Sequence, residues 1–94
     1  MGIREGLAMQ RLHCTYRNHT IVADVIEYEG SPLPWAAGCR ITAPDGRSSR
    51  RFPLPHERAF LSDRDKAEQV SLAHGKWLVD QHLDQSRELF ASAA

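Results

Sequence analysis

The sequence predicts an α+β fold, in which a three- to four-stranded antiparallel sheet packs against one long C-terminal helix. Polar and apolar residues alternate through residues 20–29, which is typical of a strand with one buried face. Residues 44–46, Pro-Asp-Gly, form a strong hairpin-turn signal between two further extended runs. No proline interrupts residues 63–90, which have helical periodicity. These observations predict strands in the first part of the chain and a helix at its end.

Each predicted strand is rich in β-branched or aromatic side chains or follows a turn signal. The four runs are residues 12–16, 20–29, 35–43 and 47–55. The Arg17-Asn18 pair between the first two fits either a tight turn or a kink within one long strand. Because proline lacks a backbone donor, Pro53 and Pro55 confine the last strand to a sheet edge or end it early.

The predicted helix begins near Ser62, whose hydroxyl can cap the first turn, and continues to about Phe90. Asp65 lies in the first turn, where an acidic side chain favours the helix N-terminus. Gly75 costs about 1 kcal/mol relative to alanine in a helix interior, so it marks either a close backbone approach or a bend. One face is predicted to lie on the sheet and consists of Ala67, Val70, Ser71, His74, Trp77 and Leu78.

A second apolar stripe on this helix consists of Leu72, Val79, Leu83 and Phe90. A helix that is apolar on two sides needs a second partner in so small a protein, since it otherwise leaves apolar surface in water. The stripe therefore predicts a protein-interaction site, occupied by a second copy in a two-fold homodimer or by another protein. The alternative is that the N-terminal arm covers the stripe with Ile3, Leu7 and Met9.

The chain has 94 residues, which is enough for one domain and too few for a second core. The predicted organisation is a flexible N-terminal arm over residues 1–9, a single α+β domain over residues 10–90 and a disordered tail over residues 91–94. Twelve basic and twelve acidic side chains cancel, so no field of the whole molecule attracts polyanions. Any electrostatic function must come from the local distribution of charge.

The composition predicts a cytoplasmic protein. The chain lacks the charged start and apolar run of a signal peptide, and no apolar stretch approaches the ~18 residues of a membrane span. Cys14 and Cys39 are the only cysteines. Two isolated cysteines favour buried free thiols in a reducing compartment over a disulfide framework.

A series of landmark residues resembles a group of small, uncharacterised bacterial proteins with a short β-sheet and a C-terminal helix. The landmarks are Tyr16-Arg17 and Trp35 at strand starts, Asp45-Gly46 in a turn, Phe60 before the helix, and Ala67 and Gly75-Lys76-Trp77-Leu78-Val79-Asp80 within it. The resemblance covers roughly residues 13–83. Asn18 stands where the pattern of that group has a glycine. The resemblance implies the same fold and brings no settled activity.

The residue types of catalytic and metal sites are present, but their spacing does not form a site. The sequence has neither HExxH nor paired CxxC, so no metal site is predicted. A GxSxG elbow and a phosphate-binding glycine loop are also missing. A Cys39–His–Asp set has no support beyond the presence of those residue types. We therefore predict no enzyme activity, no catalytic residue, no cofactor and no small-molecule substrate.

Arginines gather after the hairpin turn, at Arg47, Arg50, Arg51 and Arg58. A strand places Arg47 and Arg51 on the same face, and the planar guanidinium group pairs well with phosphate oxygens. This cluster makes nucleic-acid binding the alternative function. Against it, arginines on an edge strand also keep a sheet soluble and block edge-to-edge pairing. The first turns of the helix are also net acidic, where a double-stranded-RNA-binding module needs lysines.

The leading prediction is a non-enzymatic module that self-associates or binds a protein partner through the second helix stripe. Salt distinguishes the two functions. Phosphate binding weakens steeply as salt rises because counterions are released, whereas apolar association hardly changes.

Overall fold

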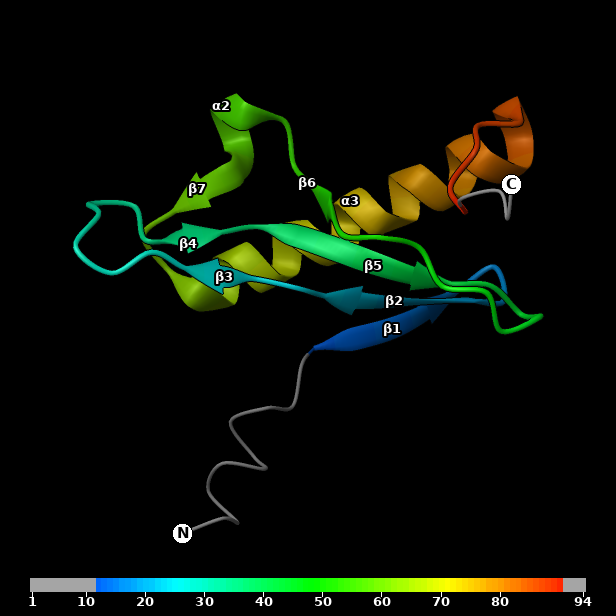
Figure 1. The fold of residues 1–94 in the computed structure, drawn as a ribbon, viewed down its shortest axis with the longest axis horizontal. Helices are drawn as coiled ribbons and strands as arrows, with labels where there is room; N and C mark the ends of the chain where they lie inside the picture. Colours follow the sequence, from blue (N-terminus) through cyan, green and yellow to red (C-terminus); the bar gives the residue numbers. More distant parts are fainter. Residues whose placement is uncertain (1–11, 91–94) are drawn as a thin grey trace, which may run out of the picture.

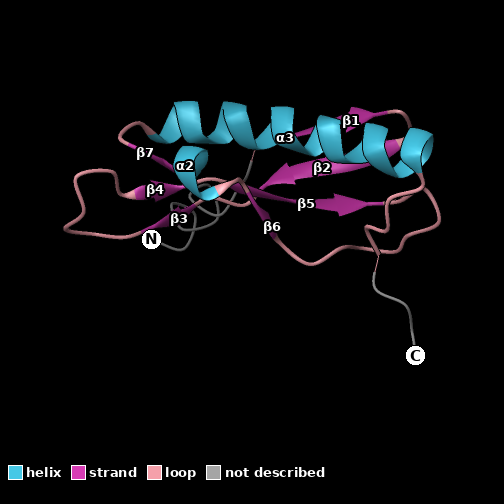
Figure 2. Cartoon of the chain, turned by 90° about the horizontal axis from the view of Figure 1, so that it is seen from above, coloured by secondary structure: helices cyan, strands magenta, loops and turns pink. Residues whose placement is uncertain are grey.

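The long helix α3 (Arg64–Gln85) lies along one side of two antiparallel sheets, so the molecule has two layers (Figure 1 and Figure 2). This computed structural model describes residues 12–90. The predicted α+β fold, an antiparallel sheet with a C-terminal helix, is confirmed. The predicted arm of residues 1–9, with its suggested role as a cover for the helix, and the predicted tail of residues 91–94 lie outside the described part of the chain.

Four strands form the first sheet in the order β1-β2-β5-β6, and three short strands form the second in the order β3-β4-β7. The bounds are β1 His13–Tyr16, β2 His19–Ala23, β3 Ile26–Glu27, β4 Trp35–Ala36, β5 Gly38–Thr42, β6 Phe52–Pro53 and β7 Phe60–Leu61, with a short helix α2 at His56–Ala59. The sequence predicts one sheet. The structure instead divides the predicted strands 20–29 and 35–43 between two sheets and adds α2 and β7.

A tight turn joins β1 to β2, so residues 12–29 do not form one long strand with a kink at Arg17-Asn18. Tyr16 pairs with His19, so the loop contains only Arg17 and Asn18. Both loop residues have positive φ, 50° and 67°, which is the pattern of a type I′ hairpin turn. Asparagine tolerates this left-handed conformation better than most residues, so Asn18 can serve where glycine is the usual choice.

The same turn contacts α3 through polar side chains. The Tyr16 hydroxyl donates to the Asp80 carboxylate at 2.9 Å, and Arg17 forms ion pairs with Asp80 at 2.8 Å and Asp84 at 3.1 Å. The hydrogen bond from Arg17 holds the pKa of Asp84 below its ordinary value. Because these groups are exposed, their contribution is mainly to fix the position of the turn against the helix.

Both long strands bend where the two sheets meet, at Asp24 after β2 and at Ala37 between β4 and β5. Arg51 bridges the two bends. Its Nε donates to the Asp24 carbonyl at 2.8 Å, and its Nη2 donates to the Ala36 carbonyl at 3.0 Å. Gly38 leaves space for the guanidinium group, which a Cβ at that position would overlap. Arg51 is therefore committed to holding the bend.

Helix α3 is shorter than predicted. It begins at Arg64 with Asp63 as the N-cap, one residue later than predicted. It ends at Gln85, because Ser86 takes a left-handed conformation with φ of 61° and closes the last turn. The prediction that the helix continues to Phe90 is wrong.

The buried side of α3 includes members of both predicted stripes and Gly75, which belongs to neither. Its buried residues are Ala67, Ser71, Gly75, Leu78 and Val79. Small residues let the helix approach the sheet, and a Cβ at Gly75 would collide with the side chain of Ile21 in β2. Close approach, rather than a bend, therefore explains the glycine. The predicted sheet face is correct for Ala67, Ser71 and Leu78, which are buried, and Val70 packs against a second buried cluster with Trp35 and Leu61. It is wrong for Trp77, which is 47% exposed and lies on the flank of the helix with His74.

The second predicted stripe is not an exposed face, so this prediction is also wrong. Val79 and Phe90 have exposed fractions of 0% and 2% and belong to the main core, and Leu72 packs against that core. Only Leu83 is exposed, at 43%. The segment after α3 brings the Phe90 ring into a stacked arrangement with His19 of β2, with 6.3 Å between ring centroids.

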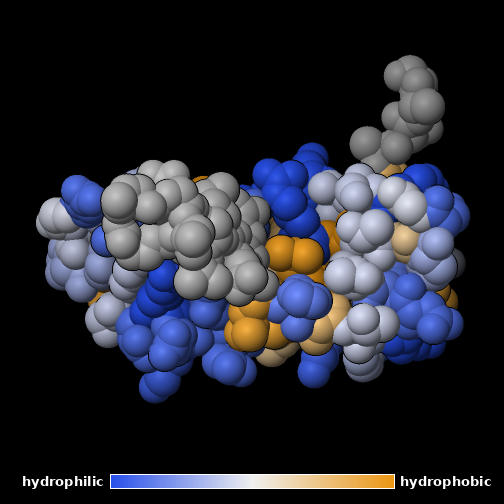
Figure 3. All heavy atoms as spheres, turned by 90° about the horizontal axis from the view of Figure 1, so that it is seen from below, coloured by the Kyte–Doolittle hydropathy of each residue, from blue (hydrophilic) through white to orange (hydrophobic). Residues whose placement is uncertain are grey.

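The strands alternate between the core and the solvent, as their sequence pattern predicts. In β5, Cys39 and Ile41 are fully buried in the core with α3, whereas Arg40 between them is exposed. Seen from below, the molecule shows apolar side chains in the middle of the face with mainly hydrophilic ones next to them (Figure 3). Among the described residues, no helix has the length and apolar composition needed to cross a membrane.

Candidate protein-interaction groove

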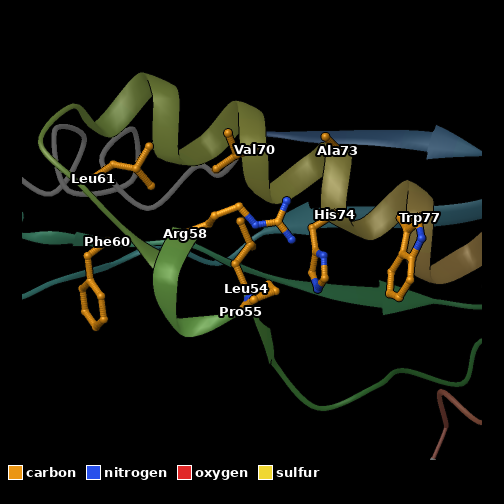
Figure 4. A pocket seen from close by; sticks show the side chains of 9 residues that line it. All are labelled: Leu54, Pro55, Arg58, Phe60, Leu61, Val70, Ala73, His74 and Trp77. Carbon is orange, nitrogen blue, oxygen red and sulfur yellow. The ribbon is translucent and has the colours of Figure 1, made fainter.

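A groove with a volume of about 720 Å³ lies between α3 and the α2–β7 segment (Figure 4). The wall on α3 consists of Val70, Ala73, His74 and Trp77. The opposite wall consists of Leu54, Pro55, Arg58, Phe60 and Leu61. Apart from one arginine and one histidine, the lining side chains are apolar or aromatic.

Regular secondary structure positions both walls. The α3 residues follow the spacing i, i+3, i+4 and i+7, so they line up along one flank of the helix. On the other side, β7 pairs with β4 in antiparallel register, with Leu61 opposite Trp35. The backbone N–H of Ala37 also donates to the carbonyl of Ala59 at 2.7 Å, which holds the end of α2 against the sheet bend. The groove is therefore built on regular secondary structure.

Exposed aromatic rings lie in both walls of the groove. Trp77 is 47% exposed, stacks on the His74 ring at 5.8 Å between centroids and lies beneath the Arg87 guanidinium at 5.4 Å. Phe60 is 39% exposed and contacts the Tyr28 ring, 6.1 Å away between centroids. Figure 4 shows Phe60 and Trp77 at opposite ends of the groove, so each end offers an exposed aromatic surface, and exposed apolar surface of this kind is typical of a binding site.

Arg58 extends from α2 across the groove toward α3, on the side where His74 lies (Figure 4). Within residues 12–90 its side chain makes no ion pair, hydrogen bond or ring contact. Every other arginine in that range makes at least one. The five N–H donors of the Arg58 guanidinium are therefore available to a ligand.

His74 is partly buried in the α3 wall. Burial lowers the pKa of His74 below its ordinary value of 6.5, and the positive charges of Arg58 and Arg87 lower it further. The imidazole is therefore neutral at pH 7 and presents one N–H donor and one acceptor. The two arginines give this part of the surface a positive potential.

The structure does not bring the four predicted nucleic-acid arginines into one site. Arg47 forms an ion pair with Asp45 at 2.9 Å, and Arg50 lies over an aromatic ring of β6. Arg51 has a side chain only 19% exposed and holds the bend between the sheets. Arg58 lines the groove. Arg47 and Arg50 both lie near Phe90, whereas Arg51 and Arg58 have separate environments.

Cys14 and Cys39 are both free thiols. Cys39 is fully buried, and burial raises its pKa to about 12, so the thiol is protonated and shielded at neutral pH. The described residues contain no group of three or more His, Cys, Asp or Glu side chains that could hold a metal ion.

Comparisons with protein-family models, with curated proteins and with solved structures found no match to this chain. The groove and its charges are therefore the basis for inferring a function.

The sequence predicts other roles for the groove residues. Its periodicity predicts Val70, His74 and Trp77 on the sheet-facing side of the helix, and its arginine cluster predicts a nucleic-acid surface that includes Arg58. The wall from α2 and β7 is not predicted. One signal for α2 is present in the sequence, since Glu57 lies in its first turn, where an acidic side chain favours the helix N-terminus. No sequence signal placed that short helix opposite the flank of α3.

Proposed function

We propose that this protein is a non-enzymatic protein-interaction module, and that the groove between α3 and α2–β7 receives an apolar segment of a protein partner. The exposed aromatic surface of Trp77 and Phe60 carries the proposal. Tryptophan is among the side chains enriched at the hot spots of protein interfaces, where partners bury it in well-packed surroundings.

The shape of the groove supports a peptide-like ligand. Residues of α3 at successive turns form one straight apolar wall, and residues of α2 and β7 form the other. Grooves of this kind receive a partner segment through side chains that repeat along one face of that segment. A segment lying parallel to α3 can contact Trp77 and Val70 together.

In this proposal the groove has the role that the sequence predicts for the second helix stripe. Because Val79 and Phe90 are buried in the core, Leu83 is the one member of that stripe with a large exposed area. A single exposed leucine is common on soluble proteins and does not by itself mark an interface.

Two features of the groove support a non-enzymatic role. The lining residues include no carboxylate that could orient His74 as a general base. The Cys39 thiol is protonated and buried away from the groove. What remains is an apolar surface with hydrogen-bond donors, which suits binding more than bond-making chemistry.

The free thiols of Cys14 and Cys39 support a reducing compartment, and we therefore propose the cytoplasm. The resemblance to small bacterial proteins supports a bacterial source and adds no activity to the proposal.

The test is selection of a random peptide library on the folded protein, followed by calorimetry with the selected peptides. We expect micromolar binding that weakens at least tenfold in Trp77→Ala and in Ala73→Gln, which fills the groove with a longer neutral side chain. The matched controls Leu83→Ala and Leu33→Ala change exposed apolar residues elsewhere on the molecule and should leave binding unchanged. Equal losses in the controls, or none in the groove variants, would reject the groove as the binding site.

A further inference from the structure

We infer that the groove prefers a partner segment in which a carboxylate accompanies bulky apolar side chains, and that Arg58 binds this carboxylate. The inference rests on the proposed function, because it specifies the chemistry of the segment that the groove receives.

The first argument is the state of Arg58 before and after binding. In the free protein its guanidinium is exposed and makes no side-chain contact within residues 12–90, so water satisfies its donors. An apolar segment that fills the groove displaces this water, and an unpaired charge at the interface is costly. A carboxylate removes this cost, because it accepts two parallel hydrogen bonds from a guanidinium group.

The second argument is the charge around Arg58. Among the residues that line the groove there is no carboxylate to compete for Arg58. Glu57, its neighbour on α2, is exposed and is not part of the lining. Arg87 adds a second positive charge above Trp77. This potential attracts an acidic segment and disfavours a basic one, so charge contributes to selection as well as to affinity.

The third argument is that the charge of Arg58 and the apolar surface of Trp77 lie in the same groove. Arg58, His74 and Trp77 line the same groove, and the charge of Arg58 is close enough to His74 to lower its pKa. One segment can therefore place an apolar side chain against Trp77 while its carboxylate meets Arg58. Neutral His74 can donate a further hydrogen bond to the same carboxylate.

The experiment uses the peptides whose binding depends on Ala73 and Trp77. We expect these peptides to contain Asp or Glu, and replacement of that residue by its amide should weaken binding about tenfold, the scale of one charge-assisted hydrogen bond. Arg58→Gln should weaken the binding of the acidic peptide to a similar extent and leave the binding of the amide peptide unchanged. The control is Arg50→Gln, which removes an exposed arginine away from the groove and should have no effect.

A charge exchange makes the assignment specific. The Arg58→Glu variant should no longer bind the acidic peptide. It should bind a peptide with lysine in place of the acidic residue, and more tightly than the wild-type protein binds that peptide. Circular dichroism and urea unfolding of each variant confirm that the fold is intact, as expected for an exposed side chain without contacts.

The outcomes separate the inference from the proposed function. Groove-dependent peptides without acidic residues, or an Arg58→Gln variant with unchanged Kd, overturn the inference and leave the proposed function standing. If the selected peptides bind Trp77→Ala and Ala73→Gln as tightly as they bind the wild-type protein, both the inference and the proposed function are wrong. A dimer in sedimentation equilibrium that dissociates in Trp77→Ala identifies a second copy as the occupant, and the inference of an acidic partner segment is then wrong.

Discussion

Arg51 and Arg58 lie in the same short segment, yet their surroundings give them opposite roles. Arg51 donates to the carbonyls of Asp24 and Ala36, which belong to two different strands at the bend between the sheets. Arg58 has no such partner and extends into an apolar groove. The chemistry of the side chain is the same in both. The number of backbone acceptors within reach decides which arginine stabilises the fold and which is available to bind.

Arg51→Lys tests the structural role. Lysine keeps the charge but has no planar fork that reaches both carbonyls, so we expect a loss of about 2 kcal/mol in the free energy of unfolding. Arg51→Ala, which leaves both acceptors unpaired, should lose about 3 kcal/mol. Urea unfolding measures both, with Arg50→Ala as the control that should stay within about 0.5 kcal/mol of the wild type. An Arg51→Ala variant as stable as that control would contradict the assigned role.

At the scale of elements, α3 divides its surface into three parts. Small residues, among them Ser71 and Gly75, face the sheet and allow close approach. One flank, with Val70 and Trp77, forms a wall of the groove. The other flank is largely covered, and the segment after the helix adds Phe90 to the core. This segment therefore belongs to the folded unit rather than to a free tail.

Phe90→Ala measures how much this returning segment contributes. Its ring is buried in the main core, so we expect its removal to destabilise the protein by about 3–4 kcal/mol. Leu83→Ala, at an exposed position of the predicted stripe, should change the stability by less than about 0.5 kcal/mol. Thermal or urea unfolding compares the two variants. A loss for Phe90→Ala as small as that expected for Leu83→Ala would contradict the burial of the Phe90 ring in the core.

At the scale of the whole molecule, the charges cancel and most arginines are paired within the fold. The chain has twelve basic and twelve acidic side chains, so its net charge is zero and the long-range attraction of a polyanion is weak. Of the four arginines in the predicted nucleic-acid cluster, Arg51 is held by backbone carbonyls and Arg47 by Asp45. Phosphate binding therefore has fewer free partners than the sequence indicates.

Fluorescence anisotropy of labelled duplex RNA, duplex DNA and single strands tests the nucleic-acid alternative. We expect no binding at near-physiological salt and at most weak binding at low salt. Arg47→Gln and Arg50→Gln are the suitable variants, because loss of Arg51 would disturb the fold. Micromolar binding that falls steeply with salt and disappears in these variants would establish nucleic acid as the ligand instead.

Local signals in the sequence determined the class of the fold and, within one residue, the starts of β1, β2, β4 and α3, but the predicted strand 47–55 is only Phe52–Pro53 in the structure. The alternation through residues 20–29 and 35–43 predicts strands because a two-residue period follows directly from the pleat of a sheet. The turn at residues 44–46 and the proline-free helix are equally local, since they depend on the backbone preferences of a few neighbouring residues. These parts could be predicted without knowing which elements touch.

Only the tertiary structure decided which side of α3 is buried and where the groove lies. Periodicity ranked the helix faces by apolar content, which favoured Trp77 over Gly75, whereas packing depends on how closely two backbones can approach. The pairing of β7 with β4 then places α2 and β7 beside one flank of the helix. Those elements are short and directly precede the helix, whereas β4 lies far from them in the sequence. This pairing is a long-range contact, and the candidate site exists only because of it.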